Sequence, residues 1–545
     1  MKKYIISAIS IFIIAGCGGG GSTTDKSPQC TYKPSQKTFN ISENDQIVKI
    51  SKTSDSKITL NVNSPKDIYI VVTSRCNNQK ISISSPNATS DISQNSKILT
   101  TNLNPKPAKT PQKVLDFRKN VSKLLHNDKV NKKYKIVKLS NVASNVNEGD
   151  SFTFCTEMDS NYNCTQKVDA TAKKVVKNIS TKQGDKNLVV WVENDEYNDG
   201  GILSTGSITQ SMVDKLADTF LQNSDNNGYD DDIYDWDTNI YGSEWGSDAS
   251  SINRNLIANS NTINILIYNM HKNGLAGYFW SKDNFKKSKI PASNEKIMFY
   301  INSQLYAKDE KETFTTLAHE FQHMIHFYRR TINNITDNTW FDEMMSETTE
   351  DLLATKLKYH GPRNVDYNDG SAGDSGNSGG RYPNFNRYNY LPLTNWGNSV
   401  IDYSKVSSFG TFLLRNYGGA KVLHDMMYSK SSNEQAVLDA TGESSFETLL
   451  NKWAEAVILS DNPDLDDTKP RYNFGDFKET KFDNIIYKLG SINFFNYNPQ
   501  PSMHSSKTLN KDANLYYKIG NGKLSGKVQI NVNIEKGGDV IIIAK

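Results

Sequence analysis

The stretch of residues 314–328 constrains the fold of this 545-residue chain more than any other part, because its apolar residues recur at the spacing of a helix. The recurring residues are Phe314, Leu317, Ala318, Phe321, Met324, Ile325 and Tyr328. Spacings of three and four place them on one side of a helix, which we expect to be the buried side. His319 and His323 point to roughly the opposite side, so we expect them to face solvent or a cleft.

These two histidines belong to a run that is typical of zinc sites, His319-Glu320-Phe321-Gln322-His323. Side chains four apart on a helix lie close enough to share one metal ion, and the glutamate then lies beside the metal as a general base. The alternative is a pair of exposed histidines on a surface helix. A third ligand would favour zinc, since catalytic zinc normally takes three protein ligands and leaves the fourth position for water.

An acidic helix downstream offers candidates for that third ligand. It begins near Trp340, and its acidic face consists of Glu343, Glu347, Glu350 and Asp351. Like charges at this spacing destabilise an isolated helix, and a nearby zinc ion would remove that penalty. The alternative is a solvated acidic face. We expect the buried positions of this helix to be Phe341, Met344, Met345, Leu352 and Leu353.

With nineteen residues between His323 and Glu343, the candidate ligands resemble those of the gluzincin metallopeptidases, of which thermolysin is a member. The resemblance implies that His319, His323 and Glu343 bind one zinc ion and that Glu347 orients His319, although aspartate is more usual at that position. Four stretches more narrowly resemble the hyicolysin family of neutral metalloproteases, namely 277–280, 298–302, 319–327 and 408–419. This similarity covers residues 130–460.

The expected chemistry is hydrolysis of a peptide bond. Zinc lowers the pKa of its water toward neutrality, and Glu320 would take the water proton and pass it to the departing amine. A second electrophile would stabilise the oxyanion that develops. Tyr403 resembles in position the tyrosine of gluzincin aminopeptidases, and His424 is the second candidate. The alternative for Tyr403 is an ordinary packed aromatic residue.

The predicted fold class is α+β, with a thermolysin-like gluzincin core. Strands are expected at 188–192, 263–268 and 297–301, with a helix at 208–221. A sheet before the zinc helix is the gluzincin arrangement. The strand at 298–302 is a candidate edge strand that substrate could join through backbone hydrogen bonds, or else a core strand. Helical patterns at 406–416, 421–428, 433–440 and 446–459 predict a mostly α-helical subdomain on the other side of the cleft.

The regions flanking this core alternate short β-favouring runs with polar breaks, which predicts β-sandwich-like accessory modules. The expected organisation is a signal peptide at 1–16, a tether at 17–29, an N-terminal β domain at 30–104, a linker at 105–113, a catalytic α/β subdomain at 114–330, a helical catalytic subdomain at 331–468 and a C-terminal β module at 469–545. Within the α/β subdomain, a helix is expected at 114–125.

The N-terminus predicts export. Two lysines precede an apolar run that is too short to span a bilayer, and Ile14-Ala15-Gly16-Cys17 resembles a bacterial lipobox. Lipid on Cys17, including palmitate, would hold the protein at a membrane of the cell envelope, outside the cytoplasm, at the outer membrane or cell surface. A plain secretory signal is the alternative.

The remaining cysteines agree with an oxidising environment, because Cys30, Cys76, Cys155 and Cys164 are even in number. Four cysteines allow three pairings. We favour Cys30 with Cys76 and Cys155 with Cys164, since each pair falls within one β-rich segment.

The charge balance of the chain limits which classes of binding partner are expected. The 63 basic and 60 acidic residues nearly balance, so nothing favours nucleic acid, and the expected partner is a protein or peptide substrate. The sequence does not fix the oligomeric state. Residues 225–232 are either a calcium site or an exposed acidic loop, since they lack the complete EF-hand pattern.

Two other functions stay open beside the endopeptidase. A surface adhesin that uses the fold as a scaffold would not need Glu320. A zinc aminopeptidase usually has a Gly-x-Met-Glu-Asn element, where this chain reads Ala292-Ser293-Asn294-Glu295-Lys296.

Overall fold

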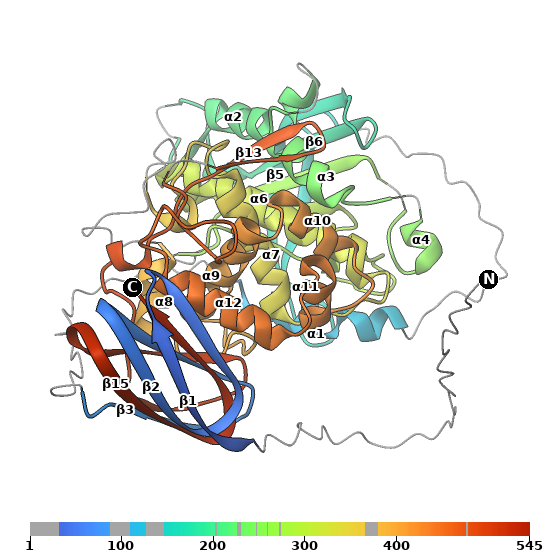
Figure 1. Cartoon of the computed structure of the whole chain (residues 1–545). Coiled ribbons are helices and arrows are strands. Elements are labelled where there is room, and N and C mark those ends of the chain that lie inside the picture. Colours follow the sequence, from blue (N-terminus) through green and yellow to red (C-terminus); the bar gives the residue numbers. More distant parts are fainter. Residues whose placement is uncertain are drawn as a thin grey trace, which may run out of the picture.

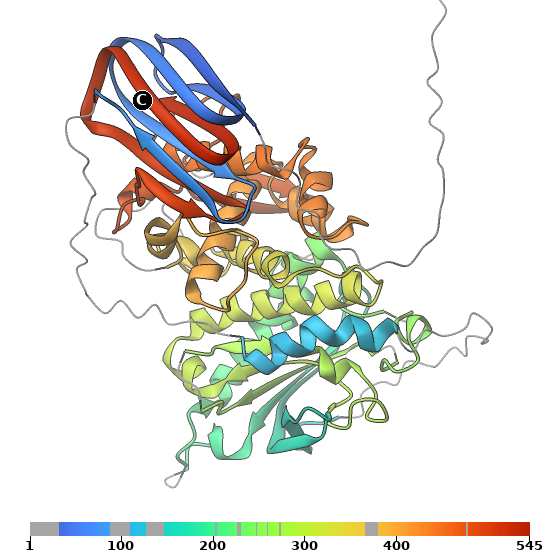
Figure 2. The same cartoon turned by 90° about the horizontal axis from the view of Figure 1, so that it is seen from below.

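The computed structural model describes residues 32–87, 110–126 and 146–545, apart from gaps at 202–203, 226–229, 247, 259, 272–273, 366–379 and 476–477. The fold is mixed α+β. Figures 1 and 2 show a region that combines a sheet with many helices and, at one end, a body of β-strands that is formed by both ends of the described chain and packs against the helices.

A six-stranded sheet supports the metal-binding region, in the order β10-β11-β9-β6-β5-β4. Its strands are β4 (Ser151–Met158), β5 (Cys164–Ile179), β6 (Lys186–Glu193), β9 (Thr262–Tyr268), β10 (Gly277–Phe279) and β11 (Ile297–Asn302). The three predicted strands are therefore confirmed as β6, β9 and β11, which run parallel. All residues of β9 and β11 are buried, as expected for strands covered on both faces.

The expectation that residues 298–302 form the edge strand is wrong. The short strand β10 pairs antiparallel with β11 and takes the edge, so β11 is an internal strand. The sequence did not reveal β10 because its three residues are too few to show the alternation or the apolar run that marks a strand.

The helices account for the other predicted segments. They are α1 (Gln112–His126), α2 (Gln210–Phe220), α3 (Ile233–Tyr241), α4 (Ala249–Ile252), α5 (Ser303–Lys308), α6 (Glu310–His326), α7 (Thr339–Leu353), α8 (Tyr382–Tyr388), α9 (Val400–Asn416), α10 (Ala420–Tyr428), α11 (Asn433–Thr441) and α12 (Phe446–Ile458). The first turn of α1 takes in residues 112 and 113, which we had expected in the linker. The five apolar positions expected to be buried on α7 are all buried.

The two β modules expected at the ends of the chain are not separate. Strands β1 (Lys33–Ile41), β2 (Gln46–Ser74), β3 (Gln79–Ser84), β14 (Ser506–Leu509) and β15 (Ala513–Ala544) form one sheet in the order β1-β2-β15-β3-β14. β15 pairs with β2 over most of its length, and near its end Val540 pairs with both Ile50 and Val72. Alternating apolar and polar residues predict a strand but do not predict which strand it pairs with. Here the N-terminal and C-terminal strands pair with one another, so each group covers strand edges that the other would leave open.

The remaining part of the predicted C-terminal module lies elsewhere. Strands β12 (Lys478–Phe482) and β13 (Ile485–Leu489) form a hairpin that packs against the helical region rather than against the β sheet of the termini. Tyr487 of this hairpin is buried, and its hydroxyl donates a hydrogen bond to the backbone carbonyl of Trp236 in α3.

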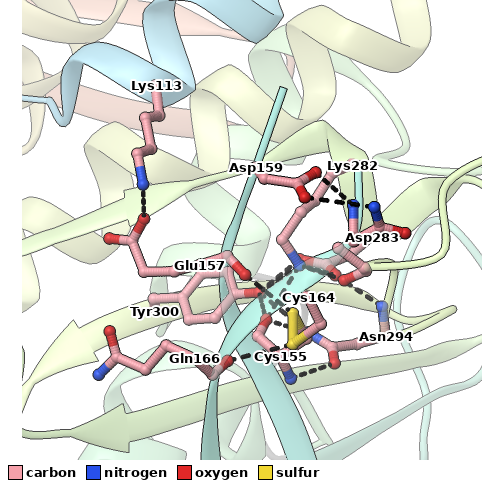
Figure 3. Close-up of a disulfide and its surroundings, with 12 residues drawn as sticks. Lys113, Cys155, Glu157, Asp159, Cys164, Gln166, Lys282, Asp283, Asn294 and Tyr300 are labelled. Atoms are coloured by element: carbon pink, nitrogen blue, oxygen red, sulfur yellow. Dashed lines mark hydrogen bonds and ion pairs between the residues drawn. A yellow bond between two sulfur atoms is a disulfide. The ribbon is translucent and has the colours of Figure 1, made fainter. Parts of the chain in front are cut away.

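A disulfide joins Cys155 to Cys164 between β4 and the start of β5, as predicted (Figure 3). Beside it the fully buried Lys282 donates to Asp283 at 2.6 Å and to the backbone carbonyl of Cys155 at 3.1 Å. Cys76 is also disulfide-bonded. Cys30, its expected partner, lies outside the described residues, so that pairing stays a prediction.

The signal peptide, Cys17, the tether and residues 105–109 of the linker also lie outside the described residues. Within the described part of the chain, no helix combines the length and apolar character needed to cross a membrane.

Candidate metal centre

The centre is built where α6 packs against α7. The side chain of Asp309 caps the start of α6 by accepting a hydrogen bond from the backbone N–H of Glu312. On the apolar side of α6, Phe321 packs edge-on against Phe220 of α2 and Phe299 of β11. The opposite side meets α7 instead of solvent. The histidines are therefore buried, which corrects the expectation that they face solvent or a cleft.

Three ligand atoms converge between these helices. The Nε2 atoms of His319 and His323 are 3.1 Å apart, and Glu343 Oε2 lies 3.3 Å from the first and 3.4 Å from the second. A tetrahedral ion with ligands at about 2.0–2.1 Å requires ligand atoms about 3.3 Å apart. Two imidazoles and one carboxylate are also a donor set suited to zinc. The residues therefore fit a metal ion.

Glu350, and not Glu347, supports the first histidine. Glu350 Oε1 lies 2.6 Å from His319 Nδ1, which leaves Nε2 free for a metal. Glu347 instead forms a two-bond ion pair with Arg381, at 2.7 and 2.8 Å. Seven residues along a helix return to within about 20° of the starting direction, whereas four residues overshoot it by about 40°. Glu350 therefore shares the face of Glu343 more closely than Glu347 does.

A second group of possible ligands shares His319, namely His319, Glu347 and Glu350. It would use Nδ1 of that ring, the atom that is bonded to Glu350. The first group, with two histidines one helical turn apart, has the spacing that the sequence predicted, and we take it as the metal site.

Asp342 supports the second histidine. It lies 2.9 Å from His323 Nδ1 and 3.1 Å from His326 Nδ1, and Arg118 donates to it at 3.1 Å. Burial alone would raise the pKa of Asp342, but His323, His326 and Arg118 hold it well below its usual range. His326 is thus a buried residue that pairs with Asp342 and Asp337.

Arg118 also reaches the third ligand. Its Nη1 donates to Glu343 Oε1 at 3.0 Å, while Oε2 faces the two histidines. Burial opposes ionisation of Glu343, but His323, His319 and Arg118 lower its pKa well below the usual range. Sequence reasoning missed Arg118, Asp342 and Arg381. Asp342 stood visibly beside Glu343, whereas nothing in the sequence connected the two arginines with this site.

Glu320, the expected base, directly follows His319 on α6 and is buried. Its Oε2 accepts a hydrogen bond of 2.6 Å from the backbone N–H of Phe279 in the edge strand β10. Tyr403 is buried, and its hydroxyl lies 3.1 Å from the hydroxyl of Thr110. Burial, and then the charge of Glu343, raise the pKa of Tyr403 well above its usual value. Tyr403 therefore lies near the centre as a protonated phenol.

The second candidate electrophile has a different environment. His424 stacks on Tyr428, contacts the ring of Phe482 and pairs with Asp425. None of these partners belongs to the metal-ligand group. The structure therefore places Tyr403, and not His424, in the electrostatic surroundings of Glu343.

The sequence pattern of the Peptidase M30 family matches residues 168–461, just over half of the chain. This range includes all three candidate ligands and Glu320. The chain belongs to the peptidase M30 family. The neutral metalloprotease ShpI of Staphylococcus hyicus is 21% identical over 258 residues, which cover 45% of this chain and 50% of that protein. The M30 chain thus spans about half the length of this curated relative, and membership in a metallopeptidase family supports a metal at this centre.

Near the predicted calcium site the structure has a group of three acidic residues. Asp231, Asp232 and Asp235 have carboxylate oxygens close enough to hold an ion, and Asp232 also caps α3. Residues 226–229 of the predicted loop lie outside the described part of this M30 chain. Calcium binding therefore stays a prediction.

Proposed function

We propose that this M30 chain is a zinc metalloendopeptidase of the gluzincin type, with a thermolysin-like core, held outside the cytoplasm by lipid on Cys17. The convergence of His319, His323 and Glu343 next to Glu320 carries the proposal. The match to a peptidase family and the similarity to a neutral metalloprotease support it.

His319, His323 and Glu343 would hold the zinc ion. When bound, zinc polarises the scissile carbonyl and lowers the pKa of a coordinated water. Glu320 would accept the proton from the attacking water and deliver it to the departing nitrogen. The N–H of Phe279 orients the Glu320 carboxylate through Oε2, which leaves Oε1 for the proton. Glu350 and Asp342 hold the imidazoles in the tautomer that presents Nε2.

Tyr403 would donate a hydrogen bond from its hydroxyl to the oxyanion. Its raised pKa keeps the phenol protonated, so it remains a hydrogen-bond donor at neutral pH. In this structure the hydroxyl lies 3.1 Å from the hydroxyl of Thr110, and if Tyr403 is the donor of that bond, it has to turn from Thr110 to the oxyanion.

Internal cleavage is favoured over aminopeptidase activity by the position of Glu295. An aminopeptidase needs a carboxylate at the metal centre to bind the free amino group of its substrate. Glu295 is exposed, and its Oε1 accepts a hydrogen bond from the backbone N–H of Lys287. The neighbouring Asn294 is buried against Cys155 and Tyr300. This segment therefore does not supply that carboxylate.

The test compares wild type with Glu320→Gln, using zinc content, unfolding and cleavage of a mixed protein substrate. We expect both proteins to bind one zinc ion, and the variant to lose activity by on the order of 10²–10⁴-fold. Glu310→Gln is the control, since Glu310 lies in the first turn of the same helix and pairs with Lys215 at the surface. Undiminished cleavage by Glu320→Gln would contradict the mechanism, and zinc-free, inactive wild type would favour an adhesin.

The anchor is tested separately. Wild type should partition into detergent and carry acyl label, and Cys17→Ala should do neither. A Cys17→Ala protein that still carries label would contradict lipidation at this residue. A peptide library would distinguish internal from terminal cleavage.

A further inference from the structure

The centre is closed in this structure. His319 is 7% exposed, Glu320 is 4% exposed and Glu343 is fully buried. A peptide bond has to reach both the metal position and Glu320 before it can be hydrolysed. The packing of α6 against α7 therefore holds the reacting groups together in a buried position.

One segment, residues 110–126, contacts the reacting groups from outside the family-matched range. At its start, Thr110 bonds to the hydroxyl of Tyr403, and the backbone carbonyl of Thr110 accepts from Asn398 at 3.4 Å. Two turns into α1, Arg118 donates to Glu343 and Asp342. A single segment thus engages both the candidate oxyanion donor and a metal-ligand carboxylate.

The same segment is held on the sheet side. Its buried apolar residues are Val114, Leu115, Phe117, Val121 and Leu125. Phe117 packs edge-on against Tyr162 and Phe285, with ring centroids 6.1 Å apart in both pairs. At the end of α1, the carbonyl of Leu125 accepts from Asn253 at 2.9 Å. In Figure 2, α1 is the blue helix that runs alongside the yellow helices of the centre.

The charge of Arg118 opposes the chemistry of the open site. Its guanidinium is held by Asp342 and by Glu343, the carboxylate that would bind the metal, so the cation and the metal ion would lie on the two oxygens of one carboxylate. Like charges at such distances repel strongly where water is excluded. In addition, Arg118 Nη2 is buried and has no hydrogen-bond partner among the described residues. The arginine is thus incompletely satisfied in this position, which makes its release less costly.

We propose that residues 110–126 form an inhibitory strap that closes the metal centre and must be displaced before substrate binds. Displacement would free the hydroxyl of Tyr403 and remove the cation from Glu343. The proposal concerns regulation and rests on the proposed peptidase function. The opposite role, in which Arg118 is a permanent support of Glu343, predicts opposite effects of mutation.

The test uses the detergent-solubilised full chain and measures how fast metal-free protein takes up zinc, together with kcat/KM on a fluorogenic peptide mixture. Arg118→Gln removes the charge but keeps an amide donor. Hydrogen bonds to charged groups are stronger than neutral ones, so losing those of Arg118 should raise the fraction of molecules in which the strap is displaced. We therefore expect zinc uptake and peptide cleavage to become about tenfold faster or more. Thr110→Val removes a neutral hydrogen bond and should speed them a few-fold.

Lys119→Gln is the matched control, because it removes an exposed positive charge from the next position of α1. It should leave both rates within about twofold of wild type. Unchanged zinc uptake in Arg118→Gln, or lower kcat/KM with excess zinc present, would overturn the strap. If Arg118→Gln does not fold, Thr110→Val decides by the same two rates.

The zinc-uptake rate separates the two proposals. Faster uptake without any peptidase activity in wild type or variants would contradict the proposed function, and of the strap proposal only the closure of the metal site by residues 110–126 would remain. Peptidase activity with unchanged uptake would do the reverse. A wild-type protein that binds no zinc would overturn both.

Discussion

Replacing Glu350 by glutamine tests which carboxylate supports the metal centre. In the structure Glu350 Oε1 lies 2.6 Å from His319 Nδ1, so its charge fixes the orientation of the ring and strengthens Nε2 as a ligand. Loss of such an outer partner typically weakens metal binding 10–100-fold, which equals about 1.4–2.7 kcal/mol. Glu350→Gln should therefore raise the zinc dissociation constant by that factor. Its side chain is partly exposed, so metal-free stability should change little.

Glu347→Gln is the matched variant, since it makes the same chemical change one helical turn away. Glu347 is fully buried and pairs with Arg381 through two hydrogen bonds. Removing one partner of a buried ion pair costs about 3–5 kcal/mol, because the other charge is left uncompensated. We expect Glu347→Gln to lower the free energy of unfolding of metal-free protein by about 3 kcal/mol, since glutamine can still accept one bond. Its zinc affinity should stay within about threefold of wild type.

The assay is a competition titration with a chromophoric zinc chelator, paired with urea unfolding of the metal-free proteins. The two variants should show opposite patterns, one losing affinity and the other stability. Weaker zinc binding in Glu347→Gln than in Glu350→Gln would refute the assignment and restore the order expected from the gluzincin resemblance.

Three further predictions concern stability. Burial would raise the pKa of Asp337, but hydrogen bonds from Arg330 and His326 lower it from 3.8 to about 2. A lowered pKa stabilises the fold above the unfolded-state pKa, so Asp337→Asn should cost about 2 kcal/mol at pH 7, and acid unfolding should show that difference shrinking from pH 4 toward pH 2. Replacing both Cys155 and Cys164 by alanine opens a short loop and should cost about 2–3 kcal/mol in denaturant unfolding, with zinc affinity unchanged; a loss below about 0.5 kcal/mol would contradict this. A Cβ on Gly410 would clash with Thr348 where α9 crosses α7, so Gly410→Ala should lower the free energy of unfolding by about 1–3 kcal/mol, and adding Thr348→Ala should restore part of it unless the clash is not the cause.

The sequence contained much of the centre because that information is local. The apolar stripe of α6 and the four-residue spacing of its histidines depend only on helical geometry, so they could be predicted without a partner. The choice of Glu343 as the third ligand depended on the gluzincin resemblance, because spacing alone allowed any of four acidic residues on α7. The strands β6, β9 and β11 were equally visible as short apolar runs. The three-residue strand β10 was not, although it supplies the N–H that orients Glu320.

Tertiary packing decided the rest. Which acid of α7 meets His319 depends on the rotation of one helix against another, and a difference of about 60° in direction separates Glu350 from Glu347. The approach of Arg118 depends on where α1 packs, a contact across more than two hundred residues of chain. The β strands of the two ends likewise pair with each other because open strand edges seek partners regardless of sequence distance. By itself the sequence determined a helix that carries two histidines and a base; only the packed structure decided what surrounds and closes them, because side-chain direction is local while contact is not.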